Sequence, residues 1–200
     1  PTKTKGAPKG PLEVSMGLPL MDRESVYKVF HLFAGMGGGA LGFHRAHARV
    51  GRVHGRFRTL GAVDVDPRAC ADFEALLGVP ATVLDLFSRE DHEAFHGRTA
   101  PSDWTEATAL DVFDAAGGEC PDVVFLSAPC KGFSGLLNGK AAKRAKYQAL
   151  NRLTLRGIRL MLEAFSHDLP TLIVFENVPR IATRGRELLD RIVELLREAG

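Results

Sequence analysis

The hydrophobic positions of the chain fall into short continuous runs, which are separated by longer stretches with a helical repeat. The runs are rich in β-branched and aromatic residues and predict strands at 26–33, 60–65, 82–86, 123–126 and 172–175. Apolar strands that alternate with helices are typical of a parallel sheet covered on both faces. The expected fold class is therefore α/β, with a doubly wound and mostly parallel sheet.

Helices are predicted in the stretches between these strands. One covers about 38–50, a second begins at Pro67 and ends at Leu77, and a third covers about 149–165. The chain ends in an amphipathic helix whose apolar residues recur at three- and four-residue spacing, at Leu188, Leu189, Ile192, Leu195 and Leu196. Another strand usually follows such a helix in this fold class, so we expect the domain to be truncated at its C-terminal end.

Three segments differ from this pattern. Residues 1–25 are rich in Lys, Gly and Pro and predict a flexible tail, which leaves 26–200 as one domain. The stretch Arg45–Arg58 is rich in Arg and His, and we interpret its later part as a basic loop. Residues 88–121 are polar and have low β propensity.

A short helix is expected near the end of this polar segment. Asp103 or Thr105 is suited to cap it, and the helix would reach Ala116. Gly117 and Gly118 are suited to end it, because glycine adopts the left-handed conformation that closes many helices.

The composition is ordinary for a soluble globular domain. Of the 200 residues, 45% are apolar and 25% are charged, and the formal net charge is +2, so the chain is not a uniformly basic nucleic-acid binder. The three cysteines are too scattered for a disulfide framework or a zinc finger, so we predict no metal and a reducing, cytoplasmic compartment. No apolar run is long enough to span a bilayer, and we expect no membrane partner.

The first predicted strand runs into the glycine cluster Gly35–Gly39 before a helix. This order is typical of nucleotide binding, because glycine permits tight turns and lets a ligand approach the main chain. The motif Gly37-x-Gly39-x-x-Gly42 also matches the dinucleotide pattern, with Asp64 some twenty residues later. A tight turn without a ligand and a nicotinamide-dependent oxidoreductase both stay open at this point.

Asp64 lies at the end of the second predicted strand. A carboxylate there can accept hydrogen bonds from two ribose hydroxyls, and the alternative is a solvated acid at a strand end. Asp66 precedes Pro67 and is better explained as the cap of the next helix.

Cys130 follows a buried strand, at the edge where open α/β sheets bind their ligands. Pro129 before it and Gly132 after it indicate a shaped loop. A cysteine attacks as the thiolate, and a free cysteine with a pKa of about 8.5 is mostly protonated at neutral pH. The alternative is an inert buried cysteine, which is how we interpret Cys70 and Cys120.

Glu176 and Asn177 follow the next buried strand. A carboxylate at a strand end beside a candidate nucleophile is suited to acid–base chemistry. The alternatives for Glu176 are a helix cap or an ion pair, for which Arg180 is one candidate partner. We expect Asn177 to hold the backbone of the loop rather than to perform chemistry.

Together these motifs resemble the DNA cytosine-5 methyltransferase family, over about residues 28–199. The resemblance implies a Rossmann-like fold that binds S-adenosylmethionine and yields S-adenosylhomocysteine. Its cofactor-binding residues would be Phe33, Ala34, Gly35, Met36, Gly37, Gly38, Asp64, Val65, Asp85, Leu86 and Pro129. Its catalytic residues would be Cys130, Glu176 and Asn177, and its DNA contacts would include Lys131, Gly132, Phe133 and Ser134.

Several positions depart from the family's usual pattern. His31 stands where the family usually has Asp, Lys131 where it has Gln, and Asp64 where it has Glu. Val65 replaces a frequent aromatic residue, which would reduce stacking on adenine. The segment 88–121 is longer than the corresponding connection in the family.

The resemblance also implies a mechanism. Cys130 would add to C6 of a cytosine flipped out of duplex DNA, while Glu176 contacts N3 of the ring. C5 would then take the methyl group from S-adenosylmethionine, and loss of the C5 proton and of the thiolate would restore the aromatic ring.

Charge alone predicts a further DNA contact. No acidic residue occurs from Leu136 to Leu162, whereas this stretch holds seven cationic side chains. They are suited to phosphate contacts, with a solvated helix face as the alternative. The cations are Lys140, Lys143, Arg144, Lys146, Arg152, Arg156 and Arg159, and we place the first four among the DNA contacts.

Two other hypotheses stay open. The family's later Arg-containing motif and its target-recognition region have no counterpart before Gly200. The chain is therefore also compatible with a non-catalytic module that binds the cofactor or DNA. It is equally compatible with one part of a methyltransferase completed by a C-terminal part, a second subunit or a second copy. A prokaryotic or phage origin and a link to restriction–modification fit either case.

Overall fold

The computed structural model describes residues 22–129 and 145–200. Within these residues the sheet has six strands: β1 Arg23–Leu32, β2 His47–Val50, β3 Val53–Asp64, β4 Ala81–Val83, β5 Val123–Leu126 and β6 Leu172–Phe175. The helices are α1 Gly38–Arg45, α2 Pro67–Leu77, α3 Arg89–His96, α4 Ala109–Ala115, α6 Ala145–Ala164, α7 Ile181–Arg184 and α8 Arg186–Ala199. None of the described helices combines the length and apolar character needed to cross a membrane.

The sheet is doubly wound, as predicted. β1 pairs in parallel with β3 on one side and with β5 on the other, while β4 extends the sheet beyond β3 and β6 extends it beyond β5. β2 runs antiparallel to β3. The strand order therefore reverses between β1 and β5, and ligands of such sheets bind at the carboxyl ends of the strands near this point.

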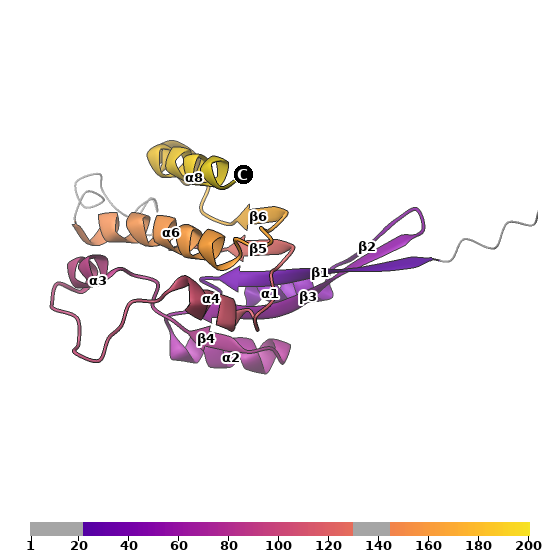
Figure 1. The fold of residues 1–200 in the computed structure, drawn as a ribbon, viewed down its shortest axis with the longest axis horizontal. Helices are drawn as coiled ribbons and strands as arrows, with labels where there is room; N and C mark the ends of the chain where they lie inside the picture. Colours follow the sequence, from indigo (N-terminus) through magenta and orange to yellow (C-terminus); the bar gives the residue numbers. More distant parts are fainter. Residues whose placement is uncertain (1–21, 130–144) are drawn as a thin grey trace, which may run out of the picture.

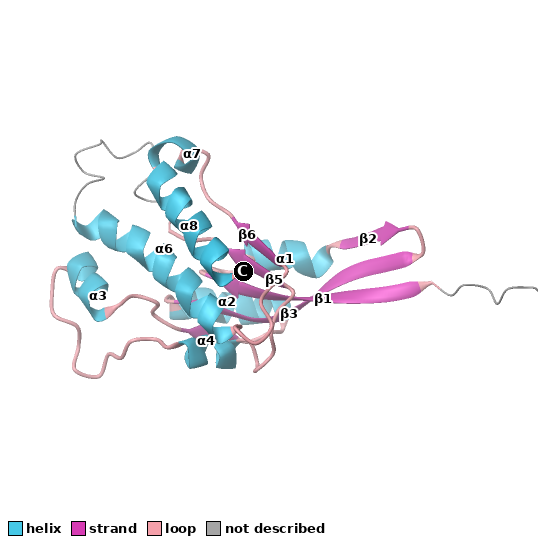
Figure 2. Cartoon of the chain, turned by 45° about the horizontal axis from the view of Figure 1, so that its top comes forward, coloured by secondary structure: helices cyan, strands magenta, loops and turns pink. Residues whose placement is uncertain are grey.

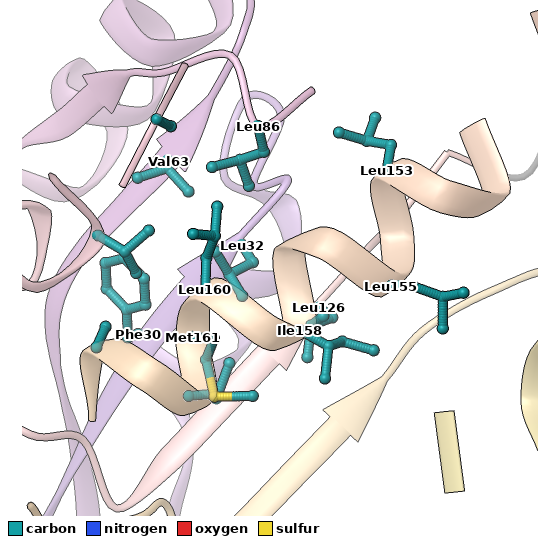
Figure 3. Close-up of a cluster of buried hydrophobic side chains, with 14 of the residues drawn as sticks. Phe30, Leu32, Val63, Leu86, Leu126, Leu153, Leu155, Ile158, Leu160 and Met161 are labelled. Atoms are coloured by element: carbon teal, nitrogen blue, oxygen red, sulfur yellow. The ribbon is translucent and has the colours of Figure 1, made fainter. Parts of the chain in front are cut away.

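Helices cover both faces of the sheet (Figure 1). The larger core packs α4, α6 and α8 against one face, where Phe30 and Leu32 of β1 and Leu126 of β5 are fully buried. Figure 3 shows α6 crossing these strands and contributing Ile158 and Met161 to this cluster. A smaller core packs α1 and α2 against the opposite face. The alternation along β1 thus divides its side chains between two apolar layers.

His31 lies between Phe30 and Leu32, and it faces the α1 and α2 side. Its ring is 1% exposed and lies 5.7 Å from the ring of Phe43, 6.1 Å from Phe73 and 5.9 Å from Phe125, between centroids. Nε2 of His31 has no hydrogen-bond partner among the described residues. Burial lowers the pKa of His31 from 6.5 to about 4, so the imidazole is neutral at physiological pH.

The Arg- and His-rich stretch is a β-hairpin, so the prediction of a basic loop is wrong. β2 and β3 pair around a turn at Gly51, whose φ is 60°. With the first half of β1 they project beyond the rest of the sheet (Figures 1 and 2). In β3, exposed His54, Arg56 and Arg58 alternate with less exposed Gly55 and Phe57. This is a strand pattern with one charged face.

Other boundaries differ by a few residues. β1 begins at Arg23, inside the tail predicted for 1–25, of which residues 1–21 lie outside the described part. α1 ends at Arg45 rather than Val50, because the chain turns there into the hairpin. β4 ends at Val83, so Leu84–Leu86 are irregular backbone.

The polar segment 88–121 contains more structure than predicted. α3 begins after Ser88, whose hydroxyl caps the helix by accepting from the N–H of Asp91, and this helix was not predicted. α4 is capped by Thr108 rather than by Asp103 or Thr105. The predicted end is confirmed, because Gly117 and Gly118 have φ values of 70° and 73°.

Candidate active site

The glycine loop turns the chain sharply between β1 and α1. Phe33, Gly35 and Gly37 have φ values of 57°, 54° and 90°, and the N–H of Gly37 donates to the carbonyl of Ala34 at 3.1 Å. A Cβ on Gly37 would lie 2.9 Å from the ring of Phe73. Glycine is therefore needed at position 37 both for its conformation and for space.

Asp64 ties the end of β3 to this loop. Its Oδ2 accepts a hydrogen bond from the N–H of Gly35 at 2.8 Å, and its Oδ1 accepts one from the N–H of Asp66 at 3.0 Å. Each carboxylate oxygen has a second acceptor site, which a ribose hydroxyl can use. Asp66 caps α2 by accepting from the N–H of Arg68 at 2.9 Å, as the sequence predicted.

Asp85 follows β4 and is held by three donors. Its Oδ1 accepts from the N–H of Phe87 at 3.0 Å. Its Oδ2 accepts from Nδ1 of His92 at 2.9 Å and from Nε1 of Trp104 at 3.1 Å. Because the partner is a carboxylate, Nδ1 of His92 carries the hydrogen.

A pocket of about 360 Å³ lies at the carboxyl ends of β1, β3, β4 and β5. It combines apolar walls with two carboxylates and the backbone of the glycine loop. The residues that line it are Phe33, Ala34, Gly35, Val63, Asp64, Val65, Leu84, Asp85, Leu86, Phe87, Ser127, Pro129 and Leu153. This volume falls within the range of about 300–1,000 Å³ that is usual for cofactor and ligand sites.

The pocket brings together eight of the eleven residues predicted to bind the cofactor, and Met36, Gly37 and Gly38 do not line it. Met36 is 65% exposed, and Gly37 serves the turn instead. Sequence reasoning missed Val63, Leu84, Phe87 and Ser127, although all four stand in or beside the ends of predicted strands. It also missed Leu153, which reaches the pocket from α6 and has no local signal.

The lining fits S-adenosylmethionine. The Asp64 carboxylate is suited to ribose hydroxyls, and the Asp85 carboxylate can accept from an exocyclic amine. A Cβ built on Gly35 would meet no atom within 4 Å, so the space beside this backbone is open to a ligand. The apolar walls are suited to the faces of a purine ring.

A second group of polar side chains joins the ends of β5 and β6. The hydroxyl of Ser127 donates to Oε2 of Glu176 at 2.8 Å. Nδ2 of Asn177 donates to the carbonyl of Ala128 at 3.3 Å, and its Oδ1 accepts from the N–H of Val178 at 2.9 Å. Asn177 thus holds the backbone around the site, as we expected.

Neither a helix cap nor an ion pair with Arg180 is found for Glu176 in the described part of the chain. No ion pair with Arg180 is present there, and α7 begins without a side-chain cap. Glu176 is exposed and points its carboxylate at Ser127, a residue of the pocket. The acid and the pocket therefore share one edge of the sheet.

The predicted nucleophile and most of the predicted DNA contacts lie outside the described residues. They are Cys130, Lys131, Gly132, Phe133, Ser134, Lys140, Lys143 and Arg144. Pro129, which directly precedes Cys130 in the chain, lines the pocket. Lys146 is described, and its Nζ lies 4.7 Å from the centroid of the Phe95 ring, where it makes a cation–π contact.

Two further cations of the acid-free stretch bind acids of the 88–121 segment. Arg152 forms an ion pair with Asp91 at 2.6 Å, and Arg156 donates to Glu106 at 3.1 Å and to the carbonyl of Ala107 at 2.8 Å. These side chains hold the segment on α6, so they are not free for phosphate contacts.

The other two cysteines differ from each other. Cys70 is buried, and its Sγ lies 3.7 Å from the carbonyl oxygen of Asp64. Burial is the main cause that raises the pKa of the Cys70 thiol, which keeps it protonated and unreactive. Cys120 is only half-buried, so the prediction that it is a buried cysteine is wrong.

Comparison with known proteins supports one family. The chain is 29% identical over 174 residues to the Type II methyltransferase M.XorII of Xanthomonas oryzae pv. oryzae, and the match covers 84% of this chain. The chain spans about a third of the length of that relative, 32%. The crystal structure of S. pombe Dnmt2 methyltransferase is similar with a TM-score of 0.48 and 18% identity, over 87% of this chain and 41% of that one. Residues 27–200 match the family model of the C-5 cytosine-specific DNA methylases, and the chain therefore belongs to that family.

Proposed function

We propose that this chain carries the cofactor site and the catalytic residues for methyl transfer from S-adenosylmethionine to C5 of cytosine in duplex DNA. The observation that carries the proposal is the shared edge of the sheet. There the pocket meets the Ser127–Glu176 pair, and its lining includes Pro129, which directly precedes Cys130 in the chain. Membership of the C-5 cytosine-specific family supports the same chemistry.

Different pocket residues would bind different parts of the cofactor. Backbone of the glycine loop and the Asp64 carboxylate would bind its ribose end, and Asp85 would accept from its adenine amine. When bound, S-adenosylmethionine supplies an electrophilic methyl group. The apolar walls formed by Phe33 and Leu86 would exclude water from that group.

Cys130 and Glu176 would act on the cytosine ring. C5 of cytosine is a weak nucleophile, so the Cys130 thiolate first forms a bond to C6, and electrons of the C5–C6 bond move to C5. Glu176 would contact N3 and offset the charge that develops on the ring. After C5 has gained the methyl group, loss of the C5 proton returns its electron pair to the ring, and the sulfur leaves C6 as the thiolate.

The target base must leave the duplex before these groups can reach it. Unstacking costs a few kcal/mol, which contacts with DNA must supply. Lys131–Ser134 and the cations up to Arg144 are the proposed source of those contacts.

The test is transfer of a radiolabelled methyl group from S-adenosylmethionine to mixed genomic DNA. We expect label at C5 of cytosine with the wild-type chain, none with Cys130→Ala, and wild-type transfer with the matched control Cys120→Ala. DNA that contains 5-fluorocytosine adds a direct readout, because fluorine cannot leave C5 as a cation and the Cys130–C6 bond would persist. Equal transfer by wild type and Cys130→Ala would refute the assigned nucleophile.

A second outcome would favour a different function. If the wild-type chain binds S-adenosylmethionine but transfers no label, these 200 residues act as a cofactor-binding module. The 32% coverage of the M.XorII relative is the observation that favours this candidate. Its activity would then require a partner or a further part of the protein.

A further inference from the structure

We propose that His92 and Trp104 are positioning residues, which aim the Asp85 carboxylate at the 6-amino group of the cofactor's adenine. The inference rests on the proposed function, because it needs a purine in the pocket. It assigns a role to the segment 88–121, which the motifs of the family did not explain.

The Asp85 carboxylate has a limited number of hydrogen-bond acceptor sites. An ionised carboxylate has about four lone-pair sites. The described structure fills three of them, with the N–H of Phe87, Nδ1 of His92 and Nε1 of Trp104. Asp85 also lines the pocket, so the remaining site on Oδ1 is available to a ligand donor.

The side chains of Asp85 and His92 are largely buried. They are 17% and 10% exposed, so little water competes for their hydrogen bonds. The His92 ring packs against two other rings, with centroids 4.4 Å from His96 and 4.6 Å from Trp104. These contacts fix the plane of the imidazole and therefore the direction of its Nδ1–H.

Trp104 is itself anchored to α3. The guanidinium of Arg89 donates to the carbonyl of Trp104 at 2.9 Å and lies 5.2 Å from the centroid of its ring. The N–H of Arg89 also donates to Glu106 at 2.8 Å. Nε1–H of Trp104 is thus held toward Asp85 by the contacts of Arg89 with Trp104 and by the ring contact with His92.

This cluster is connected with α6. Asp91, beside His92 on α3, is 6% exposed and pairs with Arg152 of α6 at 2.6 Å. Arg156, one turn further along, holds Glu106. The donors to Asp85 therefore rest on the helix that also supplies Leu153 to the pocket.

Protein donors fill three acceptor sites of the Asp85 carboxylate and leave one open, and this arrangement favours a ligand that donates a hydrogen bond. A freely rotating carboxylate could also accept from water or turn away from a purine that offers an oxygen at position 6. The held carboxylate meets such an oxygen with an unpaired acceptor, which is unfavourable. The cluster should therefore increase discrimination between a 6-amino and a 6-oxo purine.

The test measures binding of S-adenosylhomocysteine and S-inosylhomocysteine to the full chain by calorimetry. Trp104→Phe removes one of the two side-chain donors to Asp85 and keeps an aromatic ring, and His92→Leu removes the other side-chain donor. His92→Asn is the rescue variant, because its amide can donate from nearly the same place as Nδ1. Thr108→Ala is the control, because it breaks the α4 capping box without touching Asp85.

We expect the wild-type chain to prefer the 6-amino ligand, and Trp104→Phe and His92→Leu to lower that preference by about fivefold each. His92→Asn and Thr108→Ala should keep the wild-type preference. The chain has one tryptophan, so its single indole N–H signal in NMR should move with the 6-amino ligand more than with the 6-oxo ligand.

Three outcomes would overturn the inference. Equal loss of affinity for both ligands in Trp104→Phe and His92→Leu would make the cluster a structural clamp, and unchanged affinity for both ligands would remove its role in recognition. Failure of the wild-type chain to bind either ligand would instead refute the proposed cofactor and the inference with it. Methyl-transfer kinetics of Trp104→Phe and His92→Leu give a second readout. A positioning role should raise KM for S-adenosylmethionine in these variants and leave kcat unchanged.

Discussion

The buried imidazole of His31 should make the stability of the fold depend on pH. Burial lowers the pKa of His31 to about 4 in the folded chain, whereas an exposed imidazole in the unfolded chain has a pKa of about 6.5. Below pH 6.5 the unfolded chain binds a proton that the folded chain does not bind until near pH 4. The folded state therefore has its full stability above pH 6.5 and loses it as the pH falls toward 4.

The size of the loss follows from the two pKa values. Each pKa unit corresponds to about 1.4 kcal/mol, so the interval amounts to about 3 kcal/mol of unfolding free energy. About 2 kcal/mol of this is already lost at pH 5, where most carboxylates are still ionised. This is a large fraction of the stability of an ordinary domain.

The assay is urea unfolding at pH 7.5 and at pH 5. His31→Leu has a similar volume, cannot titrate and removes the unpaired Nε2, so it should be at least as stable as wild type at pH 7.5. At pH 5 its advantage over wild type should grow by about 2 kcal/mol. The control His167→Gln replaces an exposed histidine and should follow wild type at both pH values.

Equal losses in wild type and His31→Leu between the two pH values would refute this reasoning. They would mean that the imidazole takes up its proton in the folded chain. An NMR titration of His31 would show the same thing directly, as a folded pKa near 6.5 instead of about 4.

Two other substitutions test the site. In Gly157→Ala the new Cβ would lie 2.8 Å from Cζ of Phe33, a pocket residue. Calorimetry should therefore show about tenfold weaker binding of S-adenosylhomocysteine. This loss is expected although alanine raises the helix propensity by up to about 1 kcal/mol. The control Gly42→Ala meets open space in α1 and should keep wild-type affinity. Ser127→Ala removes the donor to Glu176 and should slow single-turnover methyl transfer about tenfold. If cofactor affinity falls by as much as the rate, Ser127 acts through the pocket instead.

The parts of the fold that the sequence predicts well are those with strong local signals. β5 and β6 have the predicted bounds, because each is a fully apolar run flanked by polar residues and Pro or Gly. α2 also begins and ends as predicted, because Asp66 caps it and Pro67 starts it. The eight pocket residues that were predicted lie at strand ends, where topology alone brings them together.

The errors share a different cause. In the hairpin, the charge of Arg56 and Arg58 concealed an alternation of period two, and β3 is recognisable as a strand once it pairs with β1 on one side and β2 on the other. α3 has a capping serine and acids in its first turn, but the face that it buries includes the polar residues Asp91 and His92 and becomes evident only when the helix packs on α6. Long-range packing therefore decided how both elements are paired and buried, and the local sequence does not identify those partners.

A run of like charges is, for the same reason, weak evidence for DNA binding. The acid-free stretch 136–162 suggested a row of cations for phosphates, yet Arg152 and Arg156 pair with acids 61 and 50 residues away in the chain. A free cation and a paired one look identical in sequence, because the partner acid lies on another element. In the described part of the stretch these two arginines serve the Asp85 cluster. Their replacement should therefore weaken cofactor binding, whereas replacement of Lys140 or Lys143 should weaken DNA binding and flatten its salt dependence.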